Sequence, residues 1–203
     1  MIELSPNQIS GLILAGGEGR RMGNQDKGLV ELVEKPLVEY AIDCLQPLAA
    51  KLMISCNRNA ETYARYQWPL IADDENWKFT GPMAGIYAAL NACETDWLMV
   101  MPCDTPLMQT ELMAQLTKLT DAEIRVHILE QQGWQPLHGL YHKDLLPLFA
   151  QQLDSGKTGM QFFLRQLPEV QLQVSATETE LQGFRNTNNE SELSQIEAFL
   201  RAK

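Results

Sequence analysis

Short apolar runs alternate with amphipathic stretches through the first half of the chain, and this rhythm limits the folds open to it. Residues 9–15, 51–56 and 97–101 have the composition of buried strands, and residues 36–48 and 82–93 have apolar residues at helical spacing. The run 97–101 is apolar throughout, which is typical of a strand covered on both faces. The alternation therefore predicts an α/β fold of three layers, with a doubly wound, mostly parallel sheet.

The second half of the chain is less regular. Its patterns predict further helices at residues 144–153, 158–167 and 190–202, and further strands at residues 123–130, 134–141 and 170–174. The first half also predicts a short helix at 61–66, a strand at 70–72 and a helix at 110–119. No repeat or linker divides the 203 residues, which predicts a single domain, 1–203, with two lobes.

The composition and charge of the chain argue against several classes of protein. The net charge is −10 and the basic residues are scattered, which argues against a nucleic-acid-binding protein. No apolar run approaches the roughly 20 residues of a membrane-spanning helix, and the N-terminus lacks the pattern of a signal peptide. We therefore expect a cytoplasmic protein with no membrane partner, in which the four cysteines are reduced and buried.

A glycine-rich segment follows the first predicted strand. Residues 14–23 read LAGGEGRRMG, and Asp26-Lys27-Gly28 comes just after them. Glycines let a ligand approach the backbone and its N–H groups, and Arg21 and Lys27 add mobile positive charge. The segment predicts a phosphate-binding loop, although glycines after a strand can also form a simple turn.

Two familiar phosphate loops do not match this segment. From Gly17 onward the dinucleotide pattern GxGxxG fails at Met22, which stands where the last glycine belongs. The P-loop pattern fails because Lys27 precedes Gly28 and no Ser or Thr follows the lysine.

Polar residues come after the other predicted strands as well. Asp104 follows the apolar strand 97–101, and a carboxylate at the carboxyl end of such a strand can hold Mg²⁺. Asn57 and Asp73 follow the next two strands, where they could contact a nucleotide, and Gly81 opens the helix 82–93. Each residue also has an ordinary explanation as a turn residue, a helix cap or a packing glycine.

These motifs, taken in order, resemble one family. The segments 14–23, 26–28, 56–59, 81–85 and 102–106 stand in the order found in molybdenum cofactor guanylyltransferases. The resemblance is strong over about residues 10–110 and weaker toward the end, where 184–189 is similar to the family's Asn-x-Asn segment.

The resemblance implies a Rossmann-like nucleotidyltransferase that transfers GMP from GTP to molybdenum-bearing molybdopterin. It implies that about 8–120 form a nucleotide-binding lobe and about 121–203 an acceptor lobe. It further implies that GTP is bound by Leu14, Ala15, Gly16, Gly17, Lys27, Asn57, Asp73, Gly81 and Asp104. Arg21, Lys27 and Asp104 would be the catalytic residues, Asp104 would bind the Mg²⁺ cofactor, and Asn186 and Asn188 would lie on the pterin side. Other molybdenum cofactor proteins are further candidate partners.

Some features depart from the family pattern and leave alternatives open. Gly23 is followed by Asn24 where a second glycine is usual, and the segment 184–189 is less typical of the family. One extra residue before Gly81 leaves Asp73 and Asp74 as rival nucleotide contacts. The alternatives are cytidylyl transfer to molybdopterin, sugar-phosphate nucleotidyl transfer, and a carrier of molybdopterin or nucleotide without catalysis. Gly16, where cytidylyl enzymes usually have alanine, favours guanine.

Overall fold

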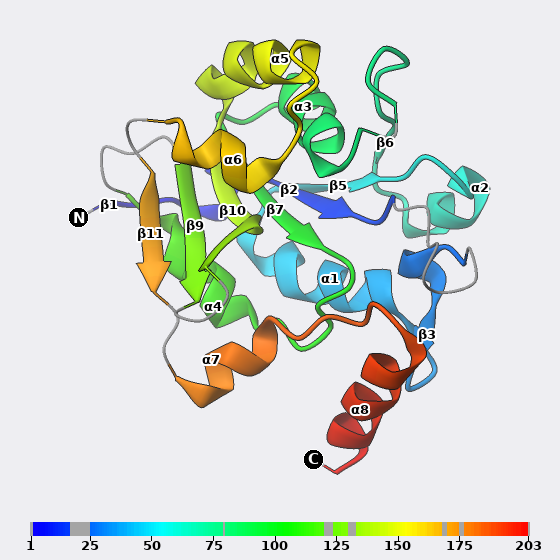
Figure 1. The fold of residues 1–203 in the computed structure, drawn as a ribbon. Helices are drawn as coiled ribbons and strands as arrows, with labels where there is room; N and C mark the ends of the chain where they lie inside the picture. The colour runs from blue at the N-terminus through cyan, green and yellow to red at the C-terminus, as the bar shows by residue number, and fades with distance from the viewer. Residues whose placement is uncertain are drawn as a thin grey trace.

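A computed structural model describes residues 2–16, 25–78, 80–119, 124–129, 133–167, 170–174 and 177–202. Within these residues the largest sheet has seven strands, in the order β11-β9-β10-β7-β2-β5-β6 (Figure 1). The strands are β2 (Ile9–Leu14), β5 (Lys51–Ser55), β6 (Leu70–Ile71), β7 (Trp97–Pro102), β9 (Ile124–Leu129), β10 (Gly133–His142) and β11 (Gln171–Val174).

Strand direction confirms the predicted fold class. β7, β2, β5 and β6 run parallel to one another, and β11 runs parallel to β9. β10 is antiparallel to both of its neighbours, β7 and β9. The sheet is therefore mostly parallel, as the alternation of strands and helices predicts.

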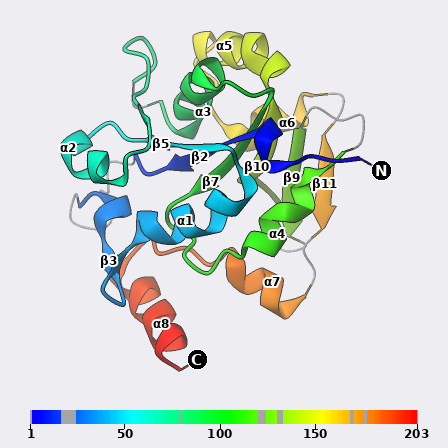
Figure 2. The same ribbon diagram turned by 180° about the vertical axis from the view of Figure 1, so that it is seen from behind.

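Helices cover both faces of the sheet. Helices α3 (Pro82–Ala92), α5 (Leu146–Asp154) and α6 (Met160–Arg165) lie on one face, and α1 (Leu37–Leu45) and α4 (Thr110–Ala114) lie on the other (Figures 1 and 2). Successive strand residues point to opposite faces, so Leu12 packs with the first group and Ile13 with the second. Each face thus has its own buried core.

Several short elements are not apparent from the sequence. The hairpin of β3 (Glu31–Leu32) and β4 (Lys35–Pro36) turns at Val33 and Glu34, whose φ angles of 50° and 61° suit a tight hairpin turn. The helix predicted at 110–119 ends earlier than expected, so that prediction is wrong for its second half. Helix α4 stops at Ala114 and is followed by a 3-10 turn, Gln115–Thr117. Strand β8 (Lys118–Leu119) then pairs with β1 (Ile2–Glu3). Helix α7 (Glu178–Gly183) was also not predicted, whereas α2 (Ala60–Tyr63) begins the expected helix 61–66.

The last helix, α8 (Glu190–Arg201), packs against an early part of the chain. Its Ile196 is buried with Leu32 and Leu37 in a third core, and both ribbon views place α8 beside the β3 hairpin (Figures 1 and 2). The predicted division into two lobes near residue 120 remains a prediction, but α8 lies with the first part of the chain.

In the part of the chain that the structure describes, no helix is both long and apolar enough to cross a membrane.

Candidate nucleotide-binding site

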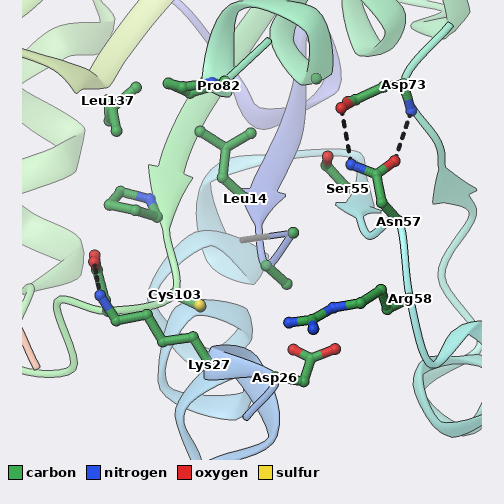
Figure 3. Close-up of a pocket in the computed structure, with 16 residues that line it drawn as sticks. Leu14, Asp26, Lys27, Ser55, Asn57, Arg58, Asp73, Pro82, Cys103 and Leu137 are labelled. Carbon is green, nitrogen blue, oxygen red and sulfur yellow. Dashed lines mark hydrogen bonds and ion pairs between the residues drawn. The ribbon is translucent and has the colours of Figure 1, made fainter. Parts of the chain in front are cut away.

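A cavity of about 350 Å³ opens at the carboxyl ends of the parallel strands (Figure 3). In open α/β sheets, ligands bind at this edge. The cavity is lined by eight of the residues that the sequence singles out: Leu14, Ala15, Gly16, Lys27, Asn57, Asp73, Gly81 and Asp104. These residues are far apart in the sequence, and the folding of the sheet brings them together.

Backbone hydrogen bonds extend beyond the ends of the strands and hold the floor of the cavity. The Ala15 N–H donates to the Ser55 carbonyl at 3.0 Å, and the Cys103 N–H donates to the Leu14 carbonyl at 3.1 Å. The chain segments leaving β2, β5 and β7 therefore stay side by side. This arrangement places Gly16 and Asp104 along one edge.

Lys27 and Asp104 form an ion pair in the cavity (Figure 3). The Lys27 Nζ donates to Asp104 Oδ2 at 2.5 Å and to Asn188 Oδ1 at 2.6 Å. The side chains of Lys27 and Asp104 are only 18% and 19% exposed, so water screens their charges weakly. Such a pair can present positive charge to a phosphate and a carboxylate to a cation.

The turn that carries Asp104 is held from two directions. The Asp104 carbonyl oxygen accepts a hydrogen bond from the Thr187 N–H at 2.9 Å. The next residue, Thr105, is fully buried, and its hydroxyl lies 3.0 Å from His138 Nε2. The His138 ring in turn packs edge-on against Phe184. Asp104 thus stands on a rigid turn.

Asn57 and Asp73 are joined by two reciprocal hydrogen bonds. Asn57 Nδ2 donates to Asp73 Oδ2 at 2.8 Å, and the Asp73 N–H donates to Asn57 Oδ1 at 3.0 Å (Figure 3). Asp73 is buried and lines the cavity, whereas Asp74 is exposed and accepts from the Asn76 N–H in a turn. Of the two rival aspartates, Asp73 is the one at the cavity.

Asp26 also lines the cavity, and sequence reasoning gave it no role beyond its place next to Lys27. It accepts hydrogen bonds from the Tyr63 hydroxyl at 2.5 Å and from Asn59 Nδ2 at 2.9 Å. Burial, then the bond to Asp26, raises the pKa of the Tyr63 hydroxyl, so Tyr63 stays protonated and donates. Arg58 lies beside the Asp26 carboxylate (Figure 3). In the sequence, only the position of Asp26 next to Lys27 indicates that it belongs to the site.

Leu137 reaches the cavity because β10 is irregular. Gln135 pairs with His127, but the next paired residue on β10 is Gly139, opposite Val126, so residues 136–138 bulge out of the ladder. Leu137 lies on this bulge and lines the cavity. The sequence carries no pattern that marks the bulge.

Two glycines shape the wall formed by α3. Gly81 caps the helix with a φ of +102°, a conformation that glycine adopts readily. At Gly85 a Cβ atom would lie 2.8 Å from Ser55 Oγ, so a larger residue there would require either the Ser55 side chain or α3 to shift.

The thiols near the cavity are not suited to nucleophilic chemistry. Cys103 is fully buried, and burial raises the pKa of its thiol well above the usual range. Burial likewise raises the pKa of Cys56 to about 11. Both thiols therefore stay protonated near neutral pH.

The remaining predicted residues differ in their placement. Gly17 and Arg21 lie outside the described residues. Asn186 is exposed and is not among the residues lining the cavity. Asn188 was predicted on the pterin side, and in the structure its side chain contacts Lys27. Its role toward the pterin stays a prediction.

The residues of the cavity suit a Mg²⁺ ion that is shared with a phosphate ligand. Among the described residues, no group of three His, Cys, Asp or Glu side chains could form a complete metal site. Mg²⁺ commonly binds one or two carboxylates and completes its shell with substrate phosphates and water. Asp104, a partly exposed carboxylate that lines the cavity beside Lys27, fits this shared mode of binding.

Comparisons with known proteins identify sequences similar to this chain. Residues 11–171 match the model of the MobA-like NTP transferase domain. The chain is 41% identical over 156 residues to a Vibrio parahaemolyticus protein named molybdenum cofactor guanylyltransferase, covering 75% of this chain and 78% of the relative. It is 37% identical over 174 residues to a Pseudomonas putida protein of the same name, covering 85% and 91%.

Solved structures share the fold. A crystal structure of molybdopterin-guanine dinucleotide biosynthesis protein A from Archaeoglobus fulgidus has a TM-score of 0.81 at 22% identity and covers 96% of this chain and 100% of that one. A nucleotidyl transferase from Methanothermobacter has a TM-score of 0.75 at 17% identity, covering 97% and 100%. At such identities the likeness concerns the fold. The extent of the family match and the identity to the curated relatives together show that this chain belongs to the MobA-like NTP transferase domain family.

Proposed function

We propose that the protein transfers GMP from GTP to molybdenum-bearing molybdopterin, which forms the molybdopterin guanine dinucleotide cofactor and releases pyrophosphate. The observation that carries the proposal is the Lys27–Asp104 pair at the strand-end cavity. The names of the relatives at 37% and 41% identity support the choice of substrates. The cytoplasm, which supplies GTP, is the proposed location of the reaction.

The reaction needs no protein base. A terminal phosphate oxygen of molybdopterin forms a bond to the α-phosphorus of GTP. The bond from that phosphorus to the bridging oxygen breaks, and its electron pair leaves with pyrophosphate. Since the attacking phosphate oxygen is already deprotonated, the main barrier is the repulsion between two anions, which positioning and positive charge reduce.

The residues of the cavity match these requirements. Lys27 supplies a positive charge that binds the triphosphate. A Mg²⁺ ion held by Asp104 would neutralise further phosphate charge. The backbone at Leu14, Ala15 and Gly16 forms the floor, and Asn57 and Asp73 are the proposed contacts to the nucleotide.

The test of the function is a nucleotide panel. We expect GTP to bind more tightly than CTP, ATP or UTP in calorimetry with Mg²⁺, and pyrophosphate to appear only when GTP and molybdopterin are both present. The basis is the Gly16 loop together with the small residues Gly81 and Gly85 at the cavity. Equal or tighter binding of CTP would instead identify a cytidylyltransferase, and GTP binding without pyrophosphate release would identify a carrier.

A further inference from the structure

The segment between α7 and α8 contacts both members of the Lys27–Asp104 pair. Thr187 donates to the Asp104 carbonyl from its N–H at 2.9 Å and from its hydroxyl at 3.3 Å. The adjacent Asn188 accepts from the Lys27 ammonium at 2.6 Å. Residues that are 161 positions apart in the sequence therefore share a hydrogen bond at Lys27, which lines the cavity.

We propose that Asn188 is a positioning residue that orients Lys27 toward the phosphates of the bound nucleotide. The proposal rests on the proposed function and assigns Asn188 to the nucleotide side of the site. An ammonium group has three N–H donors, and two acceptors from the described residues, Asp104 and Asn188, hold Lys27 from two directions. The remaining hydrogen can point to a phosphate oxygen.

The chemistry of an amide suits this role. The Asn188 oxygen accepts from Lys27 without adding negative charge to the cavity. A second carboxylate at this place would hold the ammonium equally well but would repel the triphosphate. Asn188 thus fixes the orientation of the cation and leaves its charge available for the ligand.

Asn188 is itself held by the first turn of α8. Its N–H donates to Glu192 Oε2 at 2.7 Å, and the Glu192 N–H donates to the capping side chain of Asn189 at 2.9 Å. The helix is anchored by Ile196, which packs with Leu32 from the hairpin that follows Lys27. Lys27 and Asn188 are therefore attached to elements that pack on each other, so their relative position is well determined.

A double-mutant cycle tests the proposal. The variants are Asn188→Leu, Lys27→Met and the pair together, and the readout is the Kd of GTP with Mg²⁺ and without molybdopterin. We expect Asn188→Leu to weaken GTP binding several-fold, up to about tenfold, the usual effect of losing a hydrogen bond to a charged group. In the Lys27→Met background, Asn188→Leu should have little further effect, since it acts through Lys27.

A matched pair of helix variants provides the control. Glu192→Ala removes the acceptor for the Asn188 N–H, whereas Glu190→Ala removes an exposed carboxylate from the same turn of α8. We expect weaker GTP binding for Glu192→Ala and wild-type binding for Glu190→Ala, with both measured well below their melting temperatures. Equal GTP affinity in these two variants would contradict the role of the α8 turn in positioning Asn188.

Other outcomes would overturn the proposal. Wild-type GTP affinity in Asn188→Leu, with a defect only when molybdopterin is added, would make Asn188 a pterin contact and leave the proposed function intact. A loss in Asn188→Leu that adds in full to that of Lys27→Met would show that Asn188 does not act through Lys27. If the wild-type protein does not bind GTP, the proposed function itself fails.

Discussion

At the scale of single residues, the Lys27–Asp104 pair serves ligand binding rather than stability. Removing two charges from water carries a desolvation penalty that can exceed their mutual attraction. Both side chains are about four-fifths buried, and Asp104 sits on a turn that Thr105 and Thr187 hold in place. A buried pair of this kind, at the mouth of a strand-end cavity, is better explained by ligand binding than by stability.

Asp104→Asn should separate these two roles. The substitution keeps the shape of the side chain but removes the charge that holds a hard cation. We expect GMP transfer to fall steeply, with a raised magnesium requirement, while the melting temperature changes little because the turn is held by backbone and neighbouring groups. The measurement is GMP transfer and melting temperature across a magnesium titration. Near-normal transfer at low magnesium by a folded variant would show that Asp104 does not hold the metal.

At the scale of elements, the cavity depends on how closely α3 approaches β5. Gly85 lies where a Cβ atom would stand 2.8 Å from Ser55 Oγ and 3.2 Å from Leu14 Cδ2. Ser55, Leu14 and Gly85 all line the cavity. Any outward shift of α3 therefore changes the width of the binding site as well as the packing.

Gly85→Ala tests this close approach. Alanine favours the helix by about 1 kcal/mol over glycine, so a small change in melting temperature is compatible with a marked loss of GTP affinity, which we expect at about tenfold. The double variant Gly85→Ala/Ser55→Ala removes the 2.8 Å contact and should recover part of that affinity. No recovery in the double variant would mean that the clash with Ser55 does not set the position of α3.

At the scale of the whole molecule, three cores connect the sheet, its two helical layers and the last helix. Ile196 of α8 is 1% exposed and packs with Leu32 and Leu37. Leu153 of α5 is 3% exposed and belongs to the core that α3, α5 and α6 form with the sheet. The two residues therefore offer comparable cavity-creating substitutions, one near Asn188 and one far from it in the fold.

Ile196→Ala and Leu153→Ala should have similar effects on stability and different effects on binding. Each is expected to lower the free energy of unfolding by about 2–5 kcal/mol, measured by denaturant titration. Only Ile196→Ala should also weaken GTP binding when both variants are folded, because it loosens the helix that places Asn188 beside Lys27. Equal GTP affinities would show that α8 does not contribute to the site.

Much of this protein follows from local sequence patterns. The spacing of apolar residues predicts the strands of the parallel sheet and the helices between them, since side-chain periodicity is a property of each element alone. Parallel strands end at one edge, so the residues that follow them come together, and Gly16, Asn57, Asp73 and Asp104 do line one cavity. The order of the motifs also identified the family, which the comparisons confirm.

Only the tertiary structure placed the remaining residues of the site. Leu137 reaches the cavity through a bulge in β10, Asp26 is held by Tyr63 at the end of α2, and Asn188 reaches Lys27 because α8 packs on the β3 hairpin. The sequence by itself determined the elements, the edge at which they present polar residues, and the family. The contacts between distant segments were decided by packing, because they depend on the relative placement of whole elements, which no local period encodes.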